Sequence, residues 1–326
     1  MTAPAPVIYP LAGRRVWVAG HRGMVGSALR RRLVERGCRL VEVGREALDL
    51  RRQADVEAWL AANRPDTVFV AAATVGGIHA NDTRPAEFIY DNLAIVANVV
   101  EAARKVAVEK LMVLGSSCMY PRLAAQPITE DALMTGPLEP TNEWYATAKI
   151  AGVRLCQAYR RQYGCDFITV TPTNLYGPGD DFDPETSHVV AALIRRLYEA
   201  RTKGDPAVTL WGTGTPHREF LFVDDAAEAL VFLMERYSSE ENINVGCGET
   251  VSIHRLATLV AEAVGYGGDF RYDTDRPDGM PRKQLDSRRI SALGWRPRVD
   301  LREGLRRTVA WYLAERPVRA AARAAG

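Results

Sequence analysis

The chain has 326 residues, 47% hydrophobic and 25% charged, enough to pack one large α/β unit or a core with a smaller lobe. Its 42 basic and 40 acidic residues leave a formal charge of +2, which gives no sign of the clustered basic surface needed for nucleic-acid binding. Three prolines interrupt the first twelve residues, unlike a secretory signal, and no apolar run reaches transmembrane length. Five scattered cysteines indicate neither a disulfide framework nor a metal site. We expect a cytoplasmic protein with no membrane partner.

Short apolar runs alternate with helical patterns in the first half of the chain, which is typical of βαβ units and a parallel sheet. Val56, Trp59 and Leu60, for example, recur at the spacing of one helix face. In chain order we expect strands at 15–20, 40–43, 67–72, 110–114 and 167–171, and helices at 24–36, 55–63, 88–105 and 145–163.

The pattern changes after Tyr176, where residues 177–184 are rich in turn formers and predict a loop. We then expect helices at 189–202, from about 224 to 234, at 252–264 and at 301–314, and a strand at 208–211. The expected helix caps are Asp224 with Asp225, Ser252, and the pair Asp300 and Glu303.

This order of elements predicts an α/β fold: a Rossmann-type doubly wound parallel sheet with a smaller C-terminal α/β lobe for the substrate. The expected boundaries are a flexible segment at 1–12, a dinucleotide-binding core at 13–177 with contributions from about 219–248, and a lobe made of 178–218 and 249–317. The Ala/Arg-rich end, 318–326, is expected to be frayed.

A GxxGxxG sequence at residues 20–26 follows the first expected strand and opens the first helix. Glycines in such a turn let the backbone approach a pyrophosphate, and the helix N-terminus offers free N–H groups and a positive dipole end. In this strand–turn–helix context the sequence predicts dinucleotide binding, although a glycine turn can also serve packing alone.

The choice of dinucleotide depends on the end of the second strand, where NAD enzymes usually place an acidic residue. Here that position falls near Gly44 and Arg45, and Glu42 is expected inside the strand. Because Arg45 and Arg22 together could hold a 2′-phosphate through charge-assisted hydrogen bonds, we expect NADP(H).

Tyr145 and Lys149 are four residues apart, so they share one helix face. An ammonium there can lower the pKa of the phenol and bind a ribose, which would make Tyr145 a usable acid or base. Ser116 follows the fourth expected strand, at the sheet edge where open α/β sheets present active residues. Its hydroxyl can polarise the carbonyl that Tyr145 protonates, or it can bond nearby backbone in a turn.

These features resemble the extended short-chain dehydrogenase/reductase family. Further blocks resemble the branch of that family that forms GDP-L-fucose, the GDP-4-keto-6-deoxymannose 3,5-epimerase/4-reductases. The blocks occur in the order of that branch between about residues 14 and 315, at 20–27, 75–78, 140–143, 172–178 and 218–220.

The resemblance implies an NADPH reductase that first inverts C3 and C5 of a GDP-linked 4-keto-6-deoxy sugar and then reduces C4. It implies that Ser116, Tyr145 and Lys149 form the reductase triad and that Cys118 and His188 form the epimerisation pair. Without the family, Cys118 reads as a small buried hydrophobe and His188 as a residue at a helix start. The resemblance also implies a homodimer, for which the helices at 88–105 and 145–163 offer a surface.

The same resemblance assigns the binding residues. Those expected to bind the cofactor are Gly20, His21, Arg22, Gly23, Met24, Val25, Gly26, Arg45, Asp49, Leu50, Ala72, Leu114, Gly115, Ser116, Ser117, Lys149, Pro172, Thr173, Asn174, Leu175 and His188. Those expected to bind the nucleotide sugar are Arg196, Trp211, Arg218 and Asp278, with Lys283 as an addition. No metal ligands are expected, because the histidines lack metal-binding spacing.

Three positions depart from the family pattern: Thr74 stands where lysine is common, His79 where an aliphatic residue is usual, and His217 where methionine is frequent. They bear more on which sugar is bound than on the reaction.

Three other functions compete with this interpretation: a relative that acts on a different GDP-linked 4-ketosugar, a nucleotide-sugar 4,6-dehydratase, and a non-catalytic NADP(H)-sensing protein. The dehydratases carry Asp-Glu directly after the active Ser or Thr, where this chain has Ser117 and Cys118. Sensors on this fold typically lose the Tyr or the Lys of the triad, and both are present here.

Overall fold

The computed structural model describes residues 4–275 and 278–324. Its centre is a sheet of six strands in the order β10-β5-β4-β3-β1-β2, all paired in parallel. Apolar runs make up most of these strands, because both faces of the sheet are covered. The strands are β1 (Arg15–Ala19), β2 (Arg39–Val41), β3 (Thr67–Val70), β4 (Lys110–Leu114), β5 (Asp166–Pro172) and β10 (Ile243–Val245).

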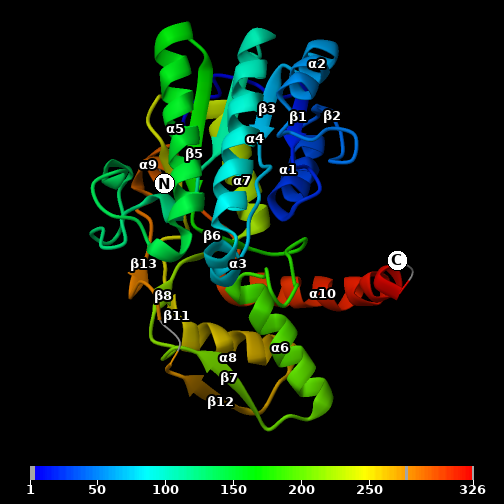
Figure 1. Ribbon diagram of the computed structural model, residues 1–326, viewed down its shortest axis with the longest axis vertical. Coiled ribbons are helices and arrows are strands. Elements are labelled where there is room, and N and C mark those ends of the chain that lie inside the picture. Colours follow the sequence, from blue (N-terminus) through cyan, green and yellow to red (C-terminus); the bar gives the residue numbers. More distant parts are fainter. Residues whose placement is uncertain (1–3, 276–277, 325–326) are drawn as a thin grey trace.

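Helices cover both faces of this sheet (Figure 1). On one face α1 (Met24–Glu35) packs against α7 (Val223–Arg236) over a core that includes Leu29 and Leu230. The other face carries α2 (Gln53–Asn63), α4 (Pro85–Lys105) and α5 (Glu143–Tyr163). The predicted doubly wound Rossmann fold is therefore confirmed.

The smaller lobe lies below the sheet unit in Figure 1 and has its own apolar core. Its helices are α6 (Val189–Lys203), α8 (Ile253–Val264) and α10 (Leu301–Ala324). Parallel strands β7 (Ala207–Trp211) and β12 (Asp269–Asp273) form one two-stranded sheet. A second small sheet joins β11 (Val251–Ser252), β8 (His217–Arg218) and β13 (Arg282–Lys283).

Several short elements are not among those expected from the sequence. They are β10, β8, β11, β12 and β13, and also α3 (Ile78–Thr83), α9 (Arg288–Ala292), the parallel pair β6 (Asn174–Tyr176) and β9 (Phe220–Phe222), and the 3-10 turns η1 (Ser117–Met119), η2 (Glu130–Ala132) and η3 (Pro140–Asn142). Ile290 and Trp295 pack in the core beside α1 and α7, so the chain returns to the sheet unit within 249–317.

Two of the three predicted caps are found. Ser252 accepts a hydrogen bond from the Arg255 N–H, and Asp300 accepts one from the Glu303 N–H. The prediction for α7 is wrong: the helix begins at Val223, so Asp224 and Asp225 lie inside its first turn. Asp225 instead accepts the N–H groups of residues 298 and 299, a tertiary use that local sequence does not reveal.

The ends of the chain also differ from expectation. Residues 4–12 are held against the sheet unit: Leu11 is fully buried, and the N–H groups of Ala5 and Ile8 donate to backbone carbonyls. Residues 1–3 lie outside the described residues. Helix α10 continues to Ala324, ten residues beyond the expected end at 314, so 318–324 are helical.

A clasp centred on Glu219 joins the lobe to the sheet unit. Its carboxylate is fully buried and accepts the N–H groups of Gly248 (2.7 Å) and Leu285 (2.8 Å). Its backbone carbonyl accepts the amide of Asn174 at 2.8 Å. One residue thus fastens three chain segments around the edge of the sheet.

The loop at 177–188 leads from the sheet unit to α6 and is held by aspartates. Asp181 and Asp183 each accept the N–H of the residue two positions later, which are Asx turns. Asp180 is 4% exposed; one of its oxygens accepts the Asp181 N–H, and the other is buried with no partner among the described residues.

Burial raises the pKa of Asp180 to about 7. A carboxyl that binds its proton more tightly when folded favours the folded state at low pH, and this contribution is lost as the pH rises from about 4 to about 7. We expect Asp180→Asn to melt above the wild type at pH 8 but not at pH 5, with a difference of at most about 4 kcal/mol between the two conditions. Melting curves at both pH values test this, with exposed Asp269 changed to Asn as control. Equal shifts at pH 5 and pH 8 would contradict it.

Candidate active site

The glycine turn lies between β1 and α1, at the carboxyl edge of the sheet. Gly20 has φ +87°, and a side chain at Gly26 would overlap the Gly20 carbonyl, so both glycines are needed for the turn itself. A Cβ on Gly23 would make only an ordinary contact, so protein packing does not explain that glycine. No described side chain caps α1, and its first turn carries no acidic residue. These features fit a diphosphate at the helix N-terminus.

The end of β2 carries both basic and acidic residues. Arg22 and Glu46 form a two-point ion pair, with N–O distances of 2.9 and 3.0 Å. Arg45, which directly precedes Glu46 in the sequence, is exposed to solvent. Glu42 was expected inside the second strand, but β2 ends at Val41 and Glu42 follows it. The Glu42 carboxylate pairs with Arg30. Both acidic side chains are thus engaged with arginines.

The other expected cofactor contacts lie along the carboxyl edge of the sheet. Ala72 follows β3 and faces Gly20, and the backbone carbonyl of Leu114, at the end of β4, accepts the Lys149 ammonium at 3.0 Å. Gly115 and Ser117 follow β4, and residues 172–175 lie at the end of β5 and the start of β6. Asp49 is held by Arg51, and the Leu50 carbonyl accepts the Asn98 amide.

The structure brings the expected triad together. The side chains of Tyr145 and Ser116 are hydrogen-bonded to each other. Lys149 lies one helical turn further along α5, with its nitrogen 5.6 Å from the centre of the Tyr145 ring. Burial lowers the pKa of Lys149 to about 8.

The expected lowering of the Tyr145 pKa is not found in the protein alone. Burial raises the pKa of Tyr145, Cys118 adds to this rise, and only the hydrogen bond with Ser116 opposes it. The Lys149 ammonium points to a backbone carbonyl, so it does not offset the cost of burying a phenolate. Tyr145 is consequently a phenol at neutral pH, the form that can give a proton to a ketone.

Cys118 lies beside the triad and is surrounded by hydrogen-bond donors. The Asn142 amide approaches its sulfur at 3.5 Å and the Lys283 ammonium at 3.4 Å. Asn142 belongs to the 140–143 block that resembles the family, and the sequence analysis assigns this residue no role. Its position just before the helix that carries Tyr145 and Lys149 is the feature of the sequence that could have indicated a place in the site.

His188 is the N-cap residue of α6. The residue is exposed to solvent, yet enough protein surrounds the imidazole for desolvation to lower its pKa, while Asp181 acts in the opposite direction. A lowered pKa makes the imidazolium a stronger acid.

Packing connects the loop at 177–188, which ends at His188, to Tyr145 of the triad. The Gly77 N–H donates to the Thr186 carbonyl at 2.8 Å, and a side chain on Gly76 would touch both that carbonyl and the Phe88 ring. Phe88 in turn packs edge-on against Tyr145, with 6.3 Å between ring centres. The glycines of the 75–78 block therefore allow this loop to approach α5 and Tyr145.

The expected nucleotide-sugar residues form a strip along the lobe. Arg218 lies opposite Lys283 in the β8–β13 pair and donates to the Asp278 carbonyl at 3.4 Å. The Asp278 carboxylate is turned into the lobe, where it accepts the Thr213 N–H and hydroxyl at 2.7 and 2.8 Å, so it shapes the loop after β7.

Two further members of the strip lie on or against β7. Arg196 reaches from α6 to the Thr209 carbonyl, and Trp211, 58% exposed, ends the strand. Arginines and an exposed indole in one strip suit a diphosphate and a flat base.

The three departures from the family pattern lie in different surroundings. Thr74 is tied to α4: its hydroxyl donates to Asp91 at 2.9 Å and its N–H to Asn92 at 3.1 Å. His79 lies exposed on α3, and His217 lies exposed on β8 next to Arg218.

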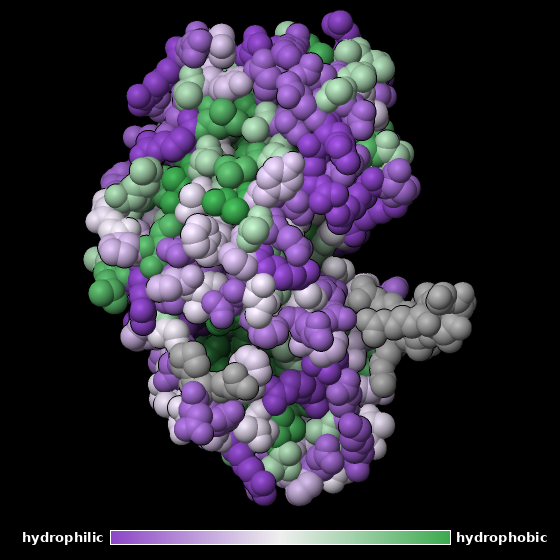
Figure 2. All heavy atoms as spheres, viewed as in Figure 1, coloured by the Kyte–Doolittle hydropathy of each residue, from purple (hydrophilic) through white to green (hydrophobic). Residues whose placement is uncertain are grey.

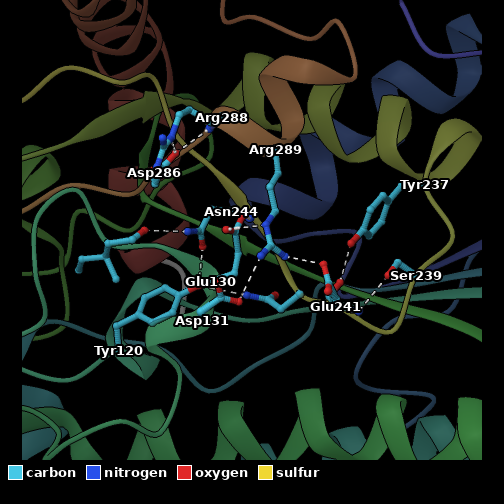
Figure 3. A network of polar contacts seen from close by, with 12 residues as sticks. Tyr120, Glu130, Asp131, Tyr237, Ser239, Glu241, Asn244, Asp286, Arg288 and Arg289 are labelled. Atoms are coloured by element: carbon cyan, nitrogen blue, oxygen red, sulfur yellow. Dashed lines mark hydrogen bonds and ion pairs between the residues drawn. The ribbon is translucent and has the colours of Figure 1, made fainter.

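A buried polar network fastens the segment that carries Ser116 and Cys118 (Figure 3). The Tyr120 hydroxyl donates to Asn244 at 2.6 Å, and the Asn244 N–H donates to Glu130 at 3.0 Å. Arg289 pairs with Glu130 at 3.2 Å and with Glu241 at 2.6 Å. Figure 3 shows these side chains converging between the segment that leads to Tyr120, β10 and α9. The network explains why Tyr120 is buried two residues after Cys118.

In the part of the chain that the structure describes, no helix is long and apolar enough to cross a membrane. Nor does any group of three or more His, Cys, Asp or Glu side chains lie where it could hold a metal ion. All five cysteines are described, and each is a free thiol.

Comparisons with known proteins agree with this geometry. Residues 16–246 match the model of the NAD dependent epimerase/dehydratase family. The chain is 56% identical over 298 residues to a GDP-L-fucose synthase of Sinorhizobium fredii, covering 91% of this chain and 95% of the relative.

Two solved structures superpose over nearly the whole chain. One is a GDP-6-OMe-4-keto-L-xylo-heptose reductase from C. jejuni, with a TM-score of 0.88 and 32% identity, covering 95% of this chain and 100% of that one. The other is a GDP-L-fucose synthetase from Naegleria fowleri bound to NADP, with a TM-score of 0.88 and 27% identity, covering 97% and 98%. The expected family is thereby confirmed: the chain belongs to the GDP-L-fucose synthase branch of the NAD dependent epimerase/dehydratase family.

Proposed function

We propose that the protein converts GDP-4-keto-6-deoxy-D-mannose to GDP-L-fucose, by inversion at C3 and C5 followed by NADPH-dependent reduction at C4. The observation that carries this proposal is the cysteine sulfur beside a hydrogen-bonded Ser–Tyr pair, with a lysine one turn away. The identity to the Sinorhizobium fredii enzyme supports the same reaction.

Inversion begins at the protons next to the ketone, which the carbonyl makes acidic. Cys118, as a thiolate, removes a proton from C3 or C5, and the electron pair moves onto O4 as an enolate. Ser116 and Tyr145 donate hydrogen bonds to O4, where this charge develops. His188 returns a proton to the opposite face of the carbon, which completes the inversion.

Reduction uses the same oxygen. NADPH supplies a hydride to C4 when it is bound. Tyr145 gives its proton to O4, a role that suits a phenol whose pKa burial has raised. Lys149, largely protonated near neutrality, can bind the ribose of the cofactor through its ammonium.

The cofactor assignment rests on the turn at 20–26 and on the arginines near it. Gly23 and the uncapped N-terminus of α1 fit the diphosphate, and Arg22 with Arg45 would hold the 2′-phosphate. Arg196 and Arg218 supply positive charge for the substrate diphosphate, and Trp211 a flat partner for its guanine.

A related GDP-linked 4-ketosugar is the second candidate substrate, supported by the structural likeness to the C. jejuni reductase. The higher identity to a GDP-L-fucose synthase favours the first. An NADP(H)-sensing protein would not need the intact triad that this chain keeps.

We also propose a homodimer formed through α4 and α5. Figure 2 shows apolar residues gathered over these helices. The incompletely buried apolar residues there include Leu93, Ala94, Ala97, Ile150, Ala151, Leu155 and Ala158.

Tyr145→Phe removes the proton donor while keeping the ring that packs on Phe88. We expect the turnover of GDP-4-keto-6-deoxymannose to fall at least about a hundredfold, because general acid catalysis is lost. Loss of NADPH absorbance measures the rate, and NADPH binding should persist. Wild-type turnover in this variant, or no turnover of this sugar by the wild type, would contradict the proposal.

Cys118→Ser replaces the thiol with a hydroxyl of similar size, which stays protonated near neutral pH and so supplies no anion to act as base. We expect exchange of the C3 and C5 protons with deuterated solvent to slow at least about a hundredfold, because a hydroxyl is far less acidic than a thiol. NMR of the sugar without cofactor turnover measures the exchange. Cys38→Ser, at a cysteine whose sulfur donates to the Leu11 carbonyl, serves as control. Exchange at the wild-type rate would refute the role of Cys118.

Glu46→Gln removes the carboxylate that occupies Arg22. We expect NADPH to bind about two- to fivefold more tightly and NADH to bind unchanged, because an exposed ion pair contributes little and only NADPH carries the 2′-phosphate. Glu46→Asp, which keeps the charge but shortens the side chain, should also tighten NADPH binding. Fluorescence titration with both nucleotides decides; equal tightening of NADH would exclude competition for Arg22.

A further inference from the structure

The Cys118 sulfur has a cation as its neighbour. Lys283 is 8% exposed, and its ammonium lies 3.4 Å from the sulfur. Among the described residues this ammonium has no carboxylate partner, although arginines elsewhere on the molecule are widely paired with acids. A buried ammonium without a counterion is costly, so its pairing with a group that can become an anion calls for an explanation.

The strand that carries Lys283 is fastened on both sides, so this contact is built into the fold. The Lys283 carbonyl accepts the Glu219 N–H at 3.3 Å, and the Gln284 carbonyl accepts the Ile128 N–H at 2.8 Å. The N–H of Leu285 donates to the Glu219 carboxylate. The ammonium thus reaches the sulfur from a strand held by main-chain hydrogen bonds.

The remaining groups near the sulfur come from three other elements. Asn142 of η3 donates its amide, and Tyr145 of α5 is a neutral phenol. Arg218 of β8 is close enough to interact electrostatically with Cys118, but its guanidinium is engaged by the carbonyls of His217 and Asp278. Asp278 and Glu139 are the acidic groups in this set, and both act on Arg218. Lys283 is therefore the cation in direct contact with the sulfur.

We infer that Lys283 is the ion partner of Cys118: its ammonium stabilises the thiolate before the sugar binds. Lys283 therefore serves the inversion at C3 and C5 rather than the reduction at C4. This role deepens the proposed function and rests on it. Lys283 acts through the sulfur, so it is a positioning residue, and it gives up no proton in the cycle. The thiolate takes the carbon proton, becomes a thiol, and returns to the thiolate by exchange with solvent.

The inference predicts an effect on the thiol in the absence of any sugar. We expect the alkylation of Cys118 by iodoacetamide at pH 7 to slow about tenfold in Lys283→Met, because only the thiolate reacts. Its pH–rate profile should move to higher pH, and Lys283→Arg should restore most of the rate. Cys118→Ser gives the background from the other four cysteines, and exposed Lys203→Met is the matched control.

A second measurement separates this role from binding of the substrate diphosphate. In Lys283→Met, exchange of the C3 and C5 protons at saturating sugar should fall in proportion to the alkylation rate. Oxidation of GDP-L-fucose by NADP⁺ in a single turnover, which needs no inversion, should keep its rate constant. A variant with wild-type alkylation and only a raised KM would overturn the inference and leave Lys283 as a phosphate ligand.

The outcomes also separate the inference from the proposed function. Normal exchange in Cys118→Ser would remove the epimerase assignment, whatever Lys283 does to alkylation. Slow exchange in Cys118→Ser together with unchanged alkylation in Lys283→Met would keep the function and reject the ion pair. If Lys283→Met does not fold, the pH–rate profile of Lys283→Gln tests the same charge; a wild-type profile in that variant would reject the ion pair.

Discussion

The buried carboxylate of Glu219 is the interaction on which the site geometry depends. It accepts main-chain N–H groups from the segment after β10 and from the segment after β13, while its own carbonyl holds the amide of Asn174. Burial raises its pKa, and the main-chain N–H donors oppose that rise. A carboxylate accepts these two donors on two separate oxygens, whereas an amide or a hydroxyl offers a single acceptor oxygen. Strands from the lobe are thereby fixed against the carboxyl edge of the sheet, where the reacting groups lie.

The site divides its tasks between the two units. The sheet unit supplies the glycine turn, Ser116 and the Tyr145 helix, all at strand ends where open parallel sheets bind ligands. The lobe supplies Lys283, Arg218 and the strip that reaches Trp211. Because the two sets meet at Cys118, the sulfur faces cations of the lobe and the phenol of the core at once. Such a meeting point suits a reaction in which one ketone serves both proton transfer at carbon and reduction.

Burial sets the protonation states that this chemistry needs. It keeps Tyr145 a phenol, weakens the hold of Lys149 on its proton, and makes the His188 imidazolium a stronger acid. Desolvation disfavours the charged form of each group. The same effect therefore raises the pKa of Tyr145 and lowers the pKa values of Lys149 and His188. The polar network around Glu130 and Arg289 holds the segment between β4 and η2, so these groups stay in place while their charges change.

The sequence by itself determined the order of the first five strands and of the long helices, the glycine turn and the Tyr145–Lys149 spacing, because each is encoded within a few residues by periodicity, turn chemistry or helical pitch. Only the tertiary structure decided that Lys283 contacts a sulfur 165 residues away and that Arg22 is occupied by Glu46. It likewise turned Asp225 from an expected cap into an acceptor for residues 298 and 299. Pairings of this kind depend on where distant segments pack, and local sequence patterns carry no record of that.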